Sequence, residues 1–452
     1  MSVSEISESG MSASEGDVNL SAERRSFQKR HLDAETQSCL DEDERWFLRQ
    51  SLSTPCLNVA TAAEGSHIVD LQGRRILDFH GNSVHQVGYG HPRVVAAIKS
   101  QLDTLPFCPR RYTNKSAIDL ARRLAELAPA PLEKVLLAPS GSAAIGMALK
   151  LARYATGRHK TLSMWDAFHG ANLDAVSVGG EALFRRGAGP LLPGTEHVPP
   201  PGLAARFFGQ DGRAHERLAD YIDYVLEVQG DVAAVIAEPM RWTTVELPPP
   251  GFWPRVRASC DRHGALLIFD EVPSCLGRTG TMFVCEQAET APDILVLGKG
   301  LGGGIMPMAA IVARADLDVV PEGALGHYTH EKSPVGCAAA LATLDVIEEE
   351  QLLTAARVLG AHALERLQSM AQRYQLISEV RGAGLYLGVE IGRRDEAEAN
   401  ARAERLLYRC LEAGLSFKLG GGNVVTLCPP LTISRDELDR ALDILEQAMS
   451  GL

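Results

Sequence analysis

The chain has 452 residues, of which 45% are apolar and 23% are charged, a composition typical of a large globular protein with an extensive core. Its formal net charge of -12 argues against nucleic acid as a partner. The nine cysteines form no Cys-x-x-Cys pair and no apolar run reaches the roughly 20 residues that span a bilayer, so we expect a cytoplasmic protein without a metal site or a membrane anchor.

The ends of the chain are expected to build a small domain around a larger central one. Residues 1–20 are rich in Ser, Glu and Gly and predict a disordered tail. Residues 21–95, which contain the hairpin pattern "HIVDLQGRRILDF", are assigned to the N-terminal part of the small domain. Residues 96–345 form the large domain, and residues 346–452 return to the small one.

Short apolar runs alternate with helical periodicity from about residue 130, the clearest being "KVLLAP", "KTLSMW", "DVAAVIAEP", "ALLIFDE" and "DILVLGKG". This alternation predicts a mostly parallel sheet covered by helices on both faces. Glu238, Asp270 and Lys299 fall at or near the ends of such runs. Because ligands gather at the carboxyl ends of parallel strands, we expect these three side chains at one site.

The first run leads through Ser140, Gly141 and Ser142 into a long helical segment. A glycine-containing helix start attracts an anion, most naturally a phosphate. An ordinary capped helix remains the alternative.

Asp270 follows four apolar residues, so its carboxylate needs a cationic partner or a protonated ring nitrogen. Arg278 is one candidate partner in a purely structural interpretation. Phe168 and His169, after the second run, offer a flat ring beside Gly170, although Phe168 is equally suited to core packing.

Lys299 ends the run "ILVLG" and precedes a glycine-rich stretch. A buried amine at a strand end suits Schiff-base chemistry, whereas a surface lysine beside a glycine turn is the plainer interpretation. A phosphate-binding helix start, a stacking ring, a buried carboxylate and a lysine are together what pyridoxal phosphate (PLP) requires. On this hypothesis Gly300 to Gly304 let the backbone approach the cofactor.

The final part of the chain is predicted to be helical from Pro334 to about Tyr374. Two strand patterns follow, "LYLGVEI" and "NVVTLCPP". Ser434 and Glu437 have the spacing of a capping box, which marks the start of the last helix.

The chain resembles the class III, fold-type I PLP enzymes, the ω-aminotransferases. The resemblance is carried by the segments "IFDEV", "GRTG", "DILVLGKGLGGG", "PVGCAAAL" and "PPLTIS". The resemblance implies an α/β fold with a mostly parallel seven-stranded sheet, a small α+β domain from both termini, and a homodimer with active sites at the interface. It assigns the Schiff base to Lys299 and the ring-nitrogen contact to Asp270. It also implies cofactor contacts from Gly141, Ser142, Phe168, His169, Glu238, Val272 and, toward the other subunit's cofactor, Thr329.

Two departures bear on activity. Thr426 stands where family members that use amino-acid donors carry a carboxylate-binding arginine, and a hydroxyl cannot replace a bidentate guanidinium. Pro273 replaces the glutamine usual after "DEV".

Within the family, the chain looks most like the branch of (R)-1-hydroxy-2-aminoethylphosphonate ammonia-lyases. This likeness lies in the segments "DFHGNSVHQVGYGHP", "LPFCPRRYTN" and "LGHYTHEKSP". Arg110 and Arg111, then Lys418 and His85, are the candidate phosphonate ligands, with solvated or structural pairing as the alternative for each.

The resemblance therefore implies an ammonia-lyase that forms phosphonoacetaldehyde and ammonia, with Lys299 or His330 as the general acid. An ω-aminotransferase, or a phospholyase acting on a phosphorylated amino alcohol, is the alternative on the same fold. A non-catalytic binding protein would not need the intact Lys299 and Asp270.

Overall fold

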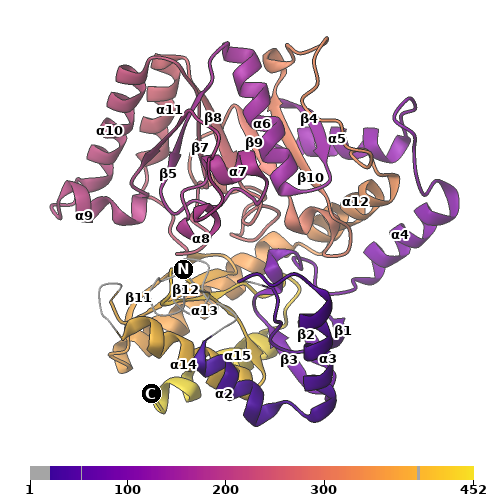
Figure 1. The fold of residues 1–452 in the computed structure, drawn as a ribbon, viewed down its shortest axis with the longest axis vertical. Coiled ribbons are helices and arrows are strands. Elements are labelled where there is room, and N and C mark those ends of the chain that lie inside the picture. The colour runs from indigo at the N-terminus through magenta and orange to yellow at the C-terminus, as the bar shows by residue number, and fades with distance from the viewer. Residues whose placement is uncertain (1–20, 52, 394–397) are drawn as a thin grey trace.

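The computed structural model describes residues 21–51, 53–393 and 398–452, so the expected tail over residues 1–20 lies outside it. The molecule has two parts, a large one built on a central sheet and a small one to which both ends of the chain contribute (Figure 1). This arrangement agrees with the expected fold class.

The large part contains a sheet whose seven described strands run in the order β4 (Leu132–Ala138), β10 (Ala309–Arg314), β9 (Ile294–Leu297), β8 (Leu266–Asp270), β7 (Val232–Ala237), β5 (Lys160–Met164) and β6 (Thr195–Val198). Neighbours from β9 to β6 pair in parallel, whereas β10 is antiparallel to both β4 and β9. The sheet is therefore mostly parallel, as predicted. The five quoted runs became β4, β5, β7, β8 and β9, but β6 and β10 were not predicted.

Helices cover both faces of this sheet because its strands are apolar on both sides. Alternate residues such as Ile268 and Phe269 enter two different clusters of buried side chains. One face packs against α6 (Gly141–Thr156) and α7 (Leu173–Val178). The other packs against helices that include α5 (Lys115–Leu127), α10 (Ala214–Gln229), α11 (Phe252–His263) and α12 (Pro334–Glu349).

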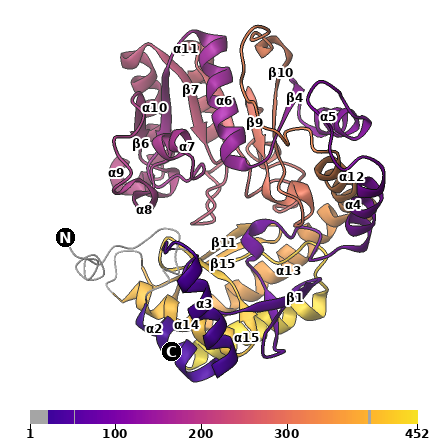
Figure 2. The same ribbon diagram turned by 45° about the vertical axis from the view of Figure 1, so that its right-hand side comes forward.

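Shorter or peripheral helices complete the large part, namely α4 (Pro92–Thr104), α8 (Ala182–Arg185) and α9 (Ala204–Phe208). Figure 2 shows α4 and α12 side by side at the junction with the small part. Among the described residues, no helix has both the length and the apolar character needed to cross a bilayer.

The small part has two four-stranded sheets in its described residues. One runs β1 (Ala60–Glu64), β2 (His67–Asp70), β3 (Arg75–Asp78) and β13 (Leu415–Ser416), and the other runs β11 (Ile377–Ala383), β12 (Tyr386–Ile391), β15 (Val424–Leu427) and β14 (Lys418–Gly420). The predicted hairpin is β2 and β3. The pairing of β3 with β13 joins the two ends of the chain in one sheet.

The helices of the small part are α2 (Ala22–His31), α3 (Ala34–Trp46), α13 (Leu352–Arg373), α14 (Ala399–Glu412) and α15 (Arg435–Ser450). The capping box at Ser434 and Glu437 is confirmed, since each side chain accepts a hydrogen bond from the other residue's backbone N–H. The predicted helical stretch after Pro334 is confirmed as α12 and α13.

Candidate active site

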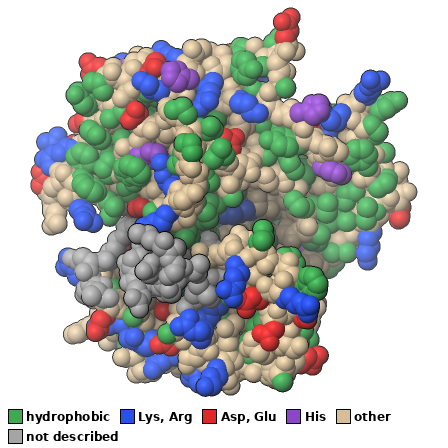
Figure 3. Space-filling model, viewed as in Figure 1, with side chains coloured by type: hydrophobic (Ala, Val, Ile, Leu, Met, Phe, Trp, Pro, Cys, Tyr) green, Lys and Arg blue, Asp and Glu red, His purple; other side chains and the backbone are tan. Residues whose placement is uncertain are grey.

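A cavity of about 340 Å³ opens where the carboxyl ends of the central strands meet the small part. Figure 3 shows the molecular surface hollowed between the two parts. The walls come from the start of α6, the segments after β5, β7, β8 and β9, a short turn after β3, and β14. Charged residues at strand ends were expected here, because parallel strands deliver their carboxyl ends to one edge.

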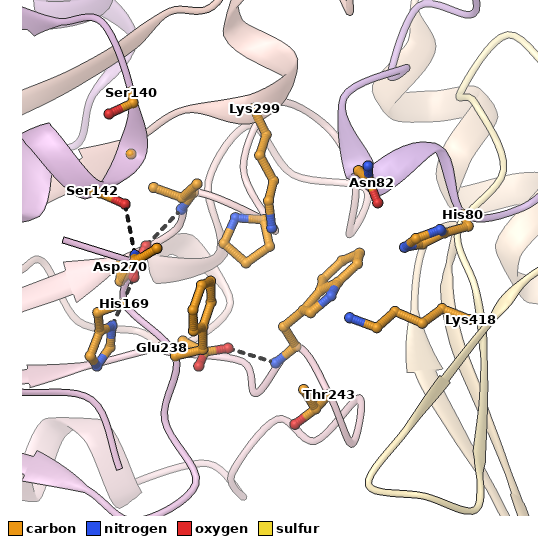
Figure 4. A pocket seen from close by; sticks show the side chains of 17 residues that line it. His80, Asn82, Ser140, Ser142, His169, Glu238, Thr243, Asp270, Lys299 and Lys418 are labelled. Atoms are coloured by element: carbon orange, nitrogen blue, oxygen red, sulfur yellow. Dashed lines mark hydrogen bonds and ion pairs between the residues drawn. The ribbon is translucent and has the colours of Figure 1, made fainter. Parts of the chain in front are cut away.

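Lys299 lies at the centre of this cavity, between its two ends (Figure 4). It follows β9 and has a φ of 46°, a left-handed backbone conformation. This conformation raises the free energy of a non-glycine residue by about 1–2 kcal/mol. Its Nζ lies 5.1 Å from the centroid of the Trp242 ring. A strained backbone that holds an amine in a cavity is typical of a functional site.

The glycines after Lys299 pack against protein, which differs from the expected approach to a cofactor. A β-carbon on Gly300 would lie 1.9 Å from Oε1 of Gln86, and one on Gly303 would lie 2.6 Å from Oγ1 of Thr343. The stretch therefore lets the lysine loop pass close to the turn after β3 and to α12. The cavity lining includes none of Gly300 to Gly304.

Asp270 lines the cavity and is only 3% exposed. Its Oδ2 lies 2.8 Å from Nδ1 of His169, and its Oδ1 accepts a hydrogen bond from Val272 N at 3.0 Å. The alternative partner Arg278 instead donates to the backbone carbonyls of Leu385 and Pro429. Asp270 is thus a buried carboxylate oriented by two neighbours at the cavity wall.

The start of α6 forms the cavity end nearest Asp270. Ser140 caps the helix by accepting from Ala143 N at 3.2 Å, and Ser142 Oγ accepts from Ala171 N at 3.1 Å. A β-carbon on Gly170 would lie 2.2 Å from Ser142 Oγ, so only glycine fits there. The capped-helix interpretation is therefore correct, and the same helix start faces the cavity, where it favours an anion.

Apolar side chains complete this end of the cavity. Phe168 lines it and packs against Phe184, with ring centroids 4.3 Å apart. Val272 lines it as well, and β-carbons on Gly141 or Gly298 would lie 3.1 Å from its Cγ1. Phe168 and Val272 therefore give this end of the cavity an apolar lining.

Glu238 anchors a hairpin that reaches into the cavity. It forms an ion pair with Arg241 and accepts a hydrogen bond from Trp242 N at 2.8 Å. The Trp242 ring stacks on Tyr386 of the small part, with centroids 4.6 Å apart and planes 14° apart. The Tyr386 hydroxyl donates to Trp242 O. Glu238 therefore positions a wall of the cavity that both parts of the molecule share.

The residues predicted to bind substrate are separated by the structure. Lys418 lines the cavity. His85 is fully buried behind it, with Nε2 at 3.1 Å from Asp78 O, and burial lowers the pKa of its ring. Arg110 and Arg111 are exposed and lie outside the lining, and Arg110 pairs with Glu331 at 3.5 Å. Thr329 is also exposed and outside the lining within one chain.

Five lining residues were not singled out from the sequence, namely His80, Asn82, Ala171, Trp242 and Thr243. His80 and His85 belong to the same quoted segment, and the turn between them, with φ of 45° at Asn82, decides which ring faces the cavity. The strand-end pattern that drew attention to Glu238 extends to Trp242 and Thr243, four and five residues further on.

The chain from residue 49 to 449 matches the family model for class III aminotransferases. It is 46% identical over 456 residues, covering 97% of this chain and 95% of the relative, to an (R)-1-hydroxy-2-aminoethylphosphonate ammonia-lyase from Vibrio splendidus. It is 38% identical over 388 residues to an acetylornithine aminotransferase from Methanopyrus kandleri, covering 85% and 92% of the two chains. The structure resembles the PLP-bound crystal structure of an amine transaminase from an uncultivated Pseudomonas species, with a TM-score of 0.82, 32% identity, and coverage of 90% and 98%.

Proposed function

We propose, from the premise that this chain belongs to the class III aminotransferase family, that it is a PLP-dependent ammonia-lyase. Its substrate is (R)-2-amino-1-hydroxyethylphosphonate and its products are phosphonoacetaldehyde and ammonia, a step in phosphonate catabolism. The observation that carries the proposal is near-full-length similarity to an ammonia-lyase in a chain that keeps Lys299 and Asp270 at one cavity. We also propose a cytoplasmic homodimer, with Thr329 directed to the partner's site.

The lining suits PLP in its chemistry. The capped start of α6, with Gly141 and Ser142, suits the phosphate group, and the apolar side chains of Phe168 and Val272 suit packing against a flat ring. Asp270 suits a protonated ring nitrogen, because a buried carboxylate needs a cationic partner. When bound, the cofactor supplies an electron sink for the carbon that carries the substrate nitrogen.

Lys299 carries the proton transfers in this proposal. Its Nζ takes the proton from the carbon next to nitrogen and returns a proton to the hydroxyl that leaves the neighbouring carbon. Addition of water to the carbon that carries nitrogen then releases ammonia and the aldehyde. This water replaces the one lost when the hydroxyl left, so the reaction has no net gain or loss of water. His330, the other predicted acid, is exposed, packs near Phe107 at 5.2 Å between centroids, and does not line the cavity.

Thr426 supports a lyase over an aminotransferase. It occupies the position at which the family resemblance expects an arginine, and its hydroxyl is buried without a hydrogen-bond partner among the described residues. A transaminase binds two amino compounds in turn, so the loss of a carboxylate clamp weakens that reaction most.

The test is to give purified holoenzyme (R)-2-amino-1-hydroxyethylphosphonate without any keto acid. Ammonia and phosphonoacetaldehyde should appear in equal amounts. Turnover that depends on added pyruvate or oxoglutarate would identify an aminotransferase and overturn the proposal. Release of phosphate from a phosphorylated amino alcohol, with no reaction of the phosphonate, would identify a phospholyase.

A further inference from the structure

The cavity has a second polar end, opposite the start of α6. Figure 4 shows Lys299 between Ser140 and Ser142 on one side and His80, Asn82 and Lys418 on the other. The residues of this far end come from the turn after β3 and from β14, both in the small part, and from the hairpin after β7. The family resemblance assigned none of them a cofactor contact.

Lys418 brings a cation to the far end. It begins β14 and is the direct partner of Thr426 in the antiparallel pair with β15. Side chains of opposed residues lie on the same face of a sheet. Because the Thr426 side chain is short, the longer Lys418 side chain can extend across this face. A cation therefore reaches the cavity from residue 418, one strand away from residue 426.

His80 supplies a neutral ring beside this cation. Burial, with the charge of Lys418, lowers the pKa of His80 from 6.5 to about 4 against the opposing effect of Asp78, and His85 and Lys299 add to the lowering. The Asp78 carboxylate accepts hydrogen bonds from His80 N at 3.0 Å, Gly81 N at 2.9 Å and the Tyr89 hydroxyl at 2.6 Å. A neutral imidazole has one N–H to donate.

Thr243 adds an unsatisfied hydroxyl. Its side chain is 3% exposed, lines the cavity, and has no hydrogen-bond partner among the described residues. A buried hydroxyl without a hydrogen-bond partner is unfavourable, so a ligand oxygen that accepts a hydrogen bond from Thr243 would remove this cost. The neighbouring Thr244 instead donates to Glu246 at 2.8 Å.

The carboxylates of the lining do not oppose an anion at this end. Among the described residues that line the cavity, Glu238 and Asp270 are the acids. Glu238 is held by Arg241, and Asp270 by His169. The remaining polar lining at the far end therefore consists of a cation and groups able to donate hydrogen bonds.

We propose that Lys418, His80 and Thr243 form the subsite for the doubly charged phosphonate of the substrate, with Asn82 at its edge. The inference rests on the proposed function for the identity of the anion. It places the amine of the substrate at Lys299 and its phosphonate at the small-part end of the same cavity, away from Arg110 and Arg111.

The test uses (1-hydroxyethyl)phosphonate, which lacks the amine and cannot react. Its affinity for the holoenzyme is measured by titration calorimetry, with the visible spectrum showing that cofactor is retained. Lys418→Gln should weaken binding about 10- to 100-fold, as expected for loss of a charge-assisted hydrogen bond, and Lys418→Arg should restore most of it. Thr243→Val should weaken binding about tenfold, whereas the matched control Thr244→Val should not.

Wild-type affinity in Lys418→Gln, together with weakened binding in Arg110→Gln or Arg111→Gln, would overturn the subsite. Equal weakening in Thr243→Val and Thr244→Val would remove Thr243 from it. The ammonia assay separates the two proposals. If wild type needs a keto acid but binds the probe through Lys418, the lyase proposal fails and the anion subsite stands. If wild type releases ammonia alone and Lys418→Gln binds normally, the subsite fails and the lyase stands.

Discussion

The two ends of the cavity are built in different ways. The end near α6 comes from segments that directly follow strands of one sheet, so its residues are positioned by a single structural element. The far end is assembled from the turn after β3 and from β14, about 340 residues apart in the chain, and from the hairpin after β7. The first end is therefore suited to chemistry that a whole family shares, and the second to distinguishing one substrate from another.

The largest effect should come from Lys299→Ala, which removes the group proposed to move the proton. We expect turnover to fall by about 10⁴-fold or more, since positioned acid–base catalysis alone contributes up to this range. The assay is ammonia release without a keto acid. The affinity for (1-hydroxyethyl)phosphonate should change by less than about threefold, and a loss as large as that of Lys418→Gln would show that the two ends do not act separately.

Asp270→Asn should reduce kcat by roughly 100-fold or more, because it removes the charge proposed to balance the cofactor ring. Its KM for the phosphonate should stay close to wild type. Steady-state kinetics at saturating cofactor measure both. A variant that keeps its kcat and loses affinity instead would place Asp270 at the wrong end of the cavity.

Gly420→Ala should impair the far end through the hairpin. An added β-carbon would lie 1.7 Å from Thr243 O, so the hairpin that carries Thr243 must shift. We expect a KM increase of about tenfold and a stability loss of about 1–3 kcal/mol, with the cofactor spectrum unchanged. Gly189→Ala is the control, since its added β-carbon meets only Leu191 N at 3.8 Å. Wild-type KM and stability in Gly420→Ala would contradict this packing.

A separate effect concerns the pH dependence of stability. Unfolded His80 takes up a proton near its ordinary pKa of 6.5, whereas folded His80 resists protonation down to about 4. The unfolded chain thus binds more protons in this window, and stability falls as pH drops from 6.5 toward 4. Denaturant unfolding of wild type and His80→Asn across this pH range gives two free energies of unfolding, and their difference isolates the contribution of His80. Parallel curves would contradict the lowered pKa of His80.

Much of the lining at the cavity end near α6 was predictable because its sequence signals are local. An apolar strand that ends in Lys299 or Asp270 predicts that the side chain is buried and that it lies at the ligand-binding edge of the sheet. Gly141 and Ser142 follow from the strand-to-helix transition. The antiparallel β10 was missed although its run "AAIVAR" is apolar, because no charged or glycine-rich end marked it as part of the site.

The far end was only partly predictable. Lys418 was named as a candidate, but nothing in its short strand says which way it points. His85 was chosen where His80 lines the cavity, since the turn over Gly81 to Ser83, all at positive φ, reverses the expected order. Arg110 and Arg111 carry the charge that a phosphonate needs, but their segment lies outside the cavity lining of one chain.

The proposed roles of the two cavity lysines are a Schiff base for Lys299 and phosphonate binding for Lys418. They are tested most directly by borohydride reduction of the holoenzyme followed by peptide mapping. Both amines line the same cavity, so the position of the fixed cofactor discriminates between them. We predict reduced cofactor on Lys299 and an unmodified Lys418. Cofactor fixed on Lys418, or on neither lysine, would contradict it.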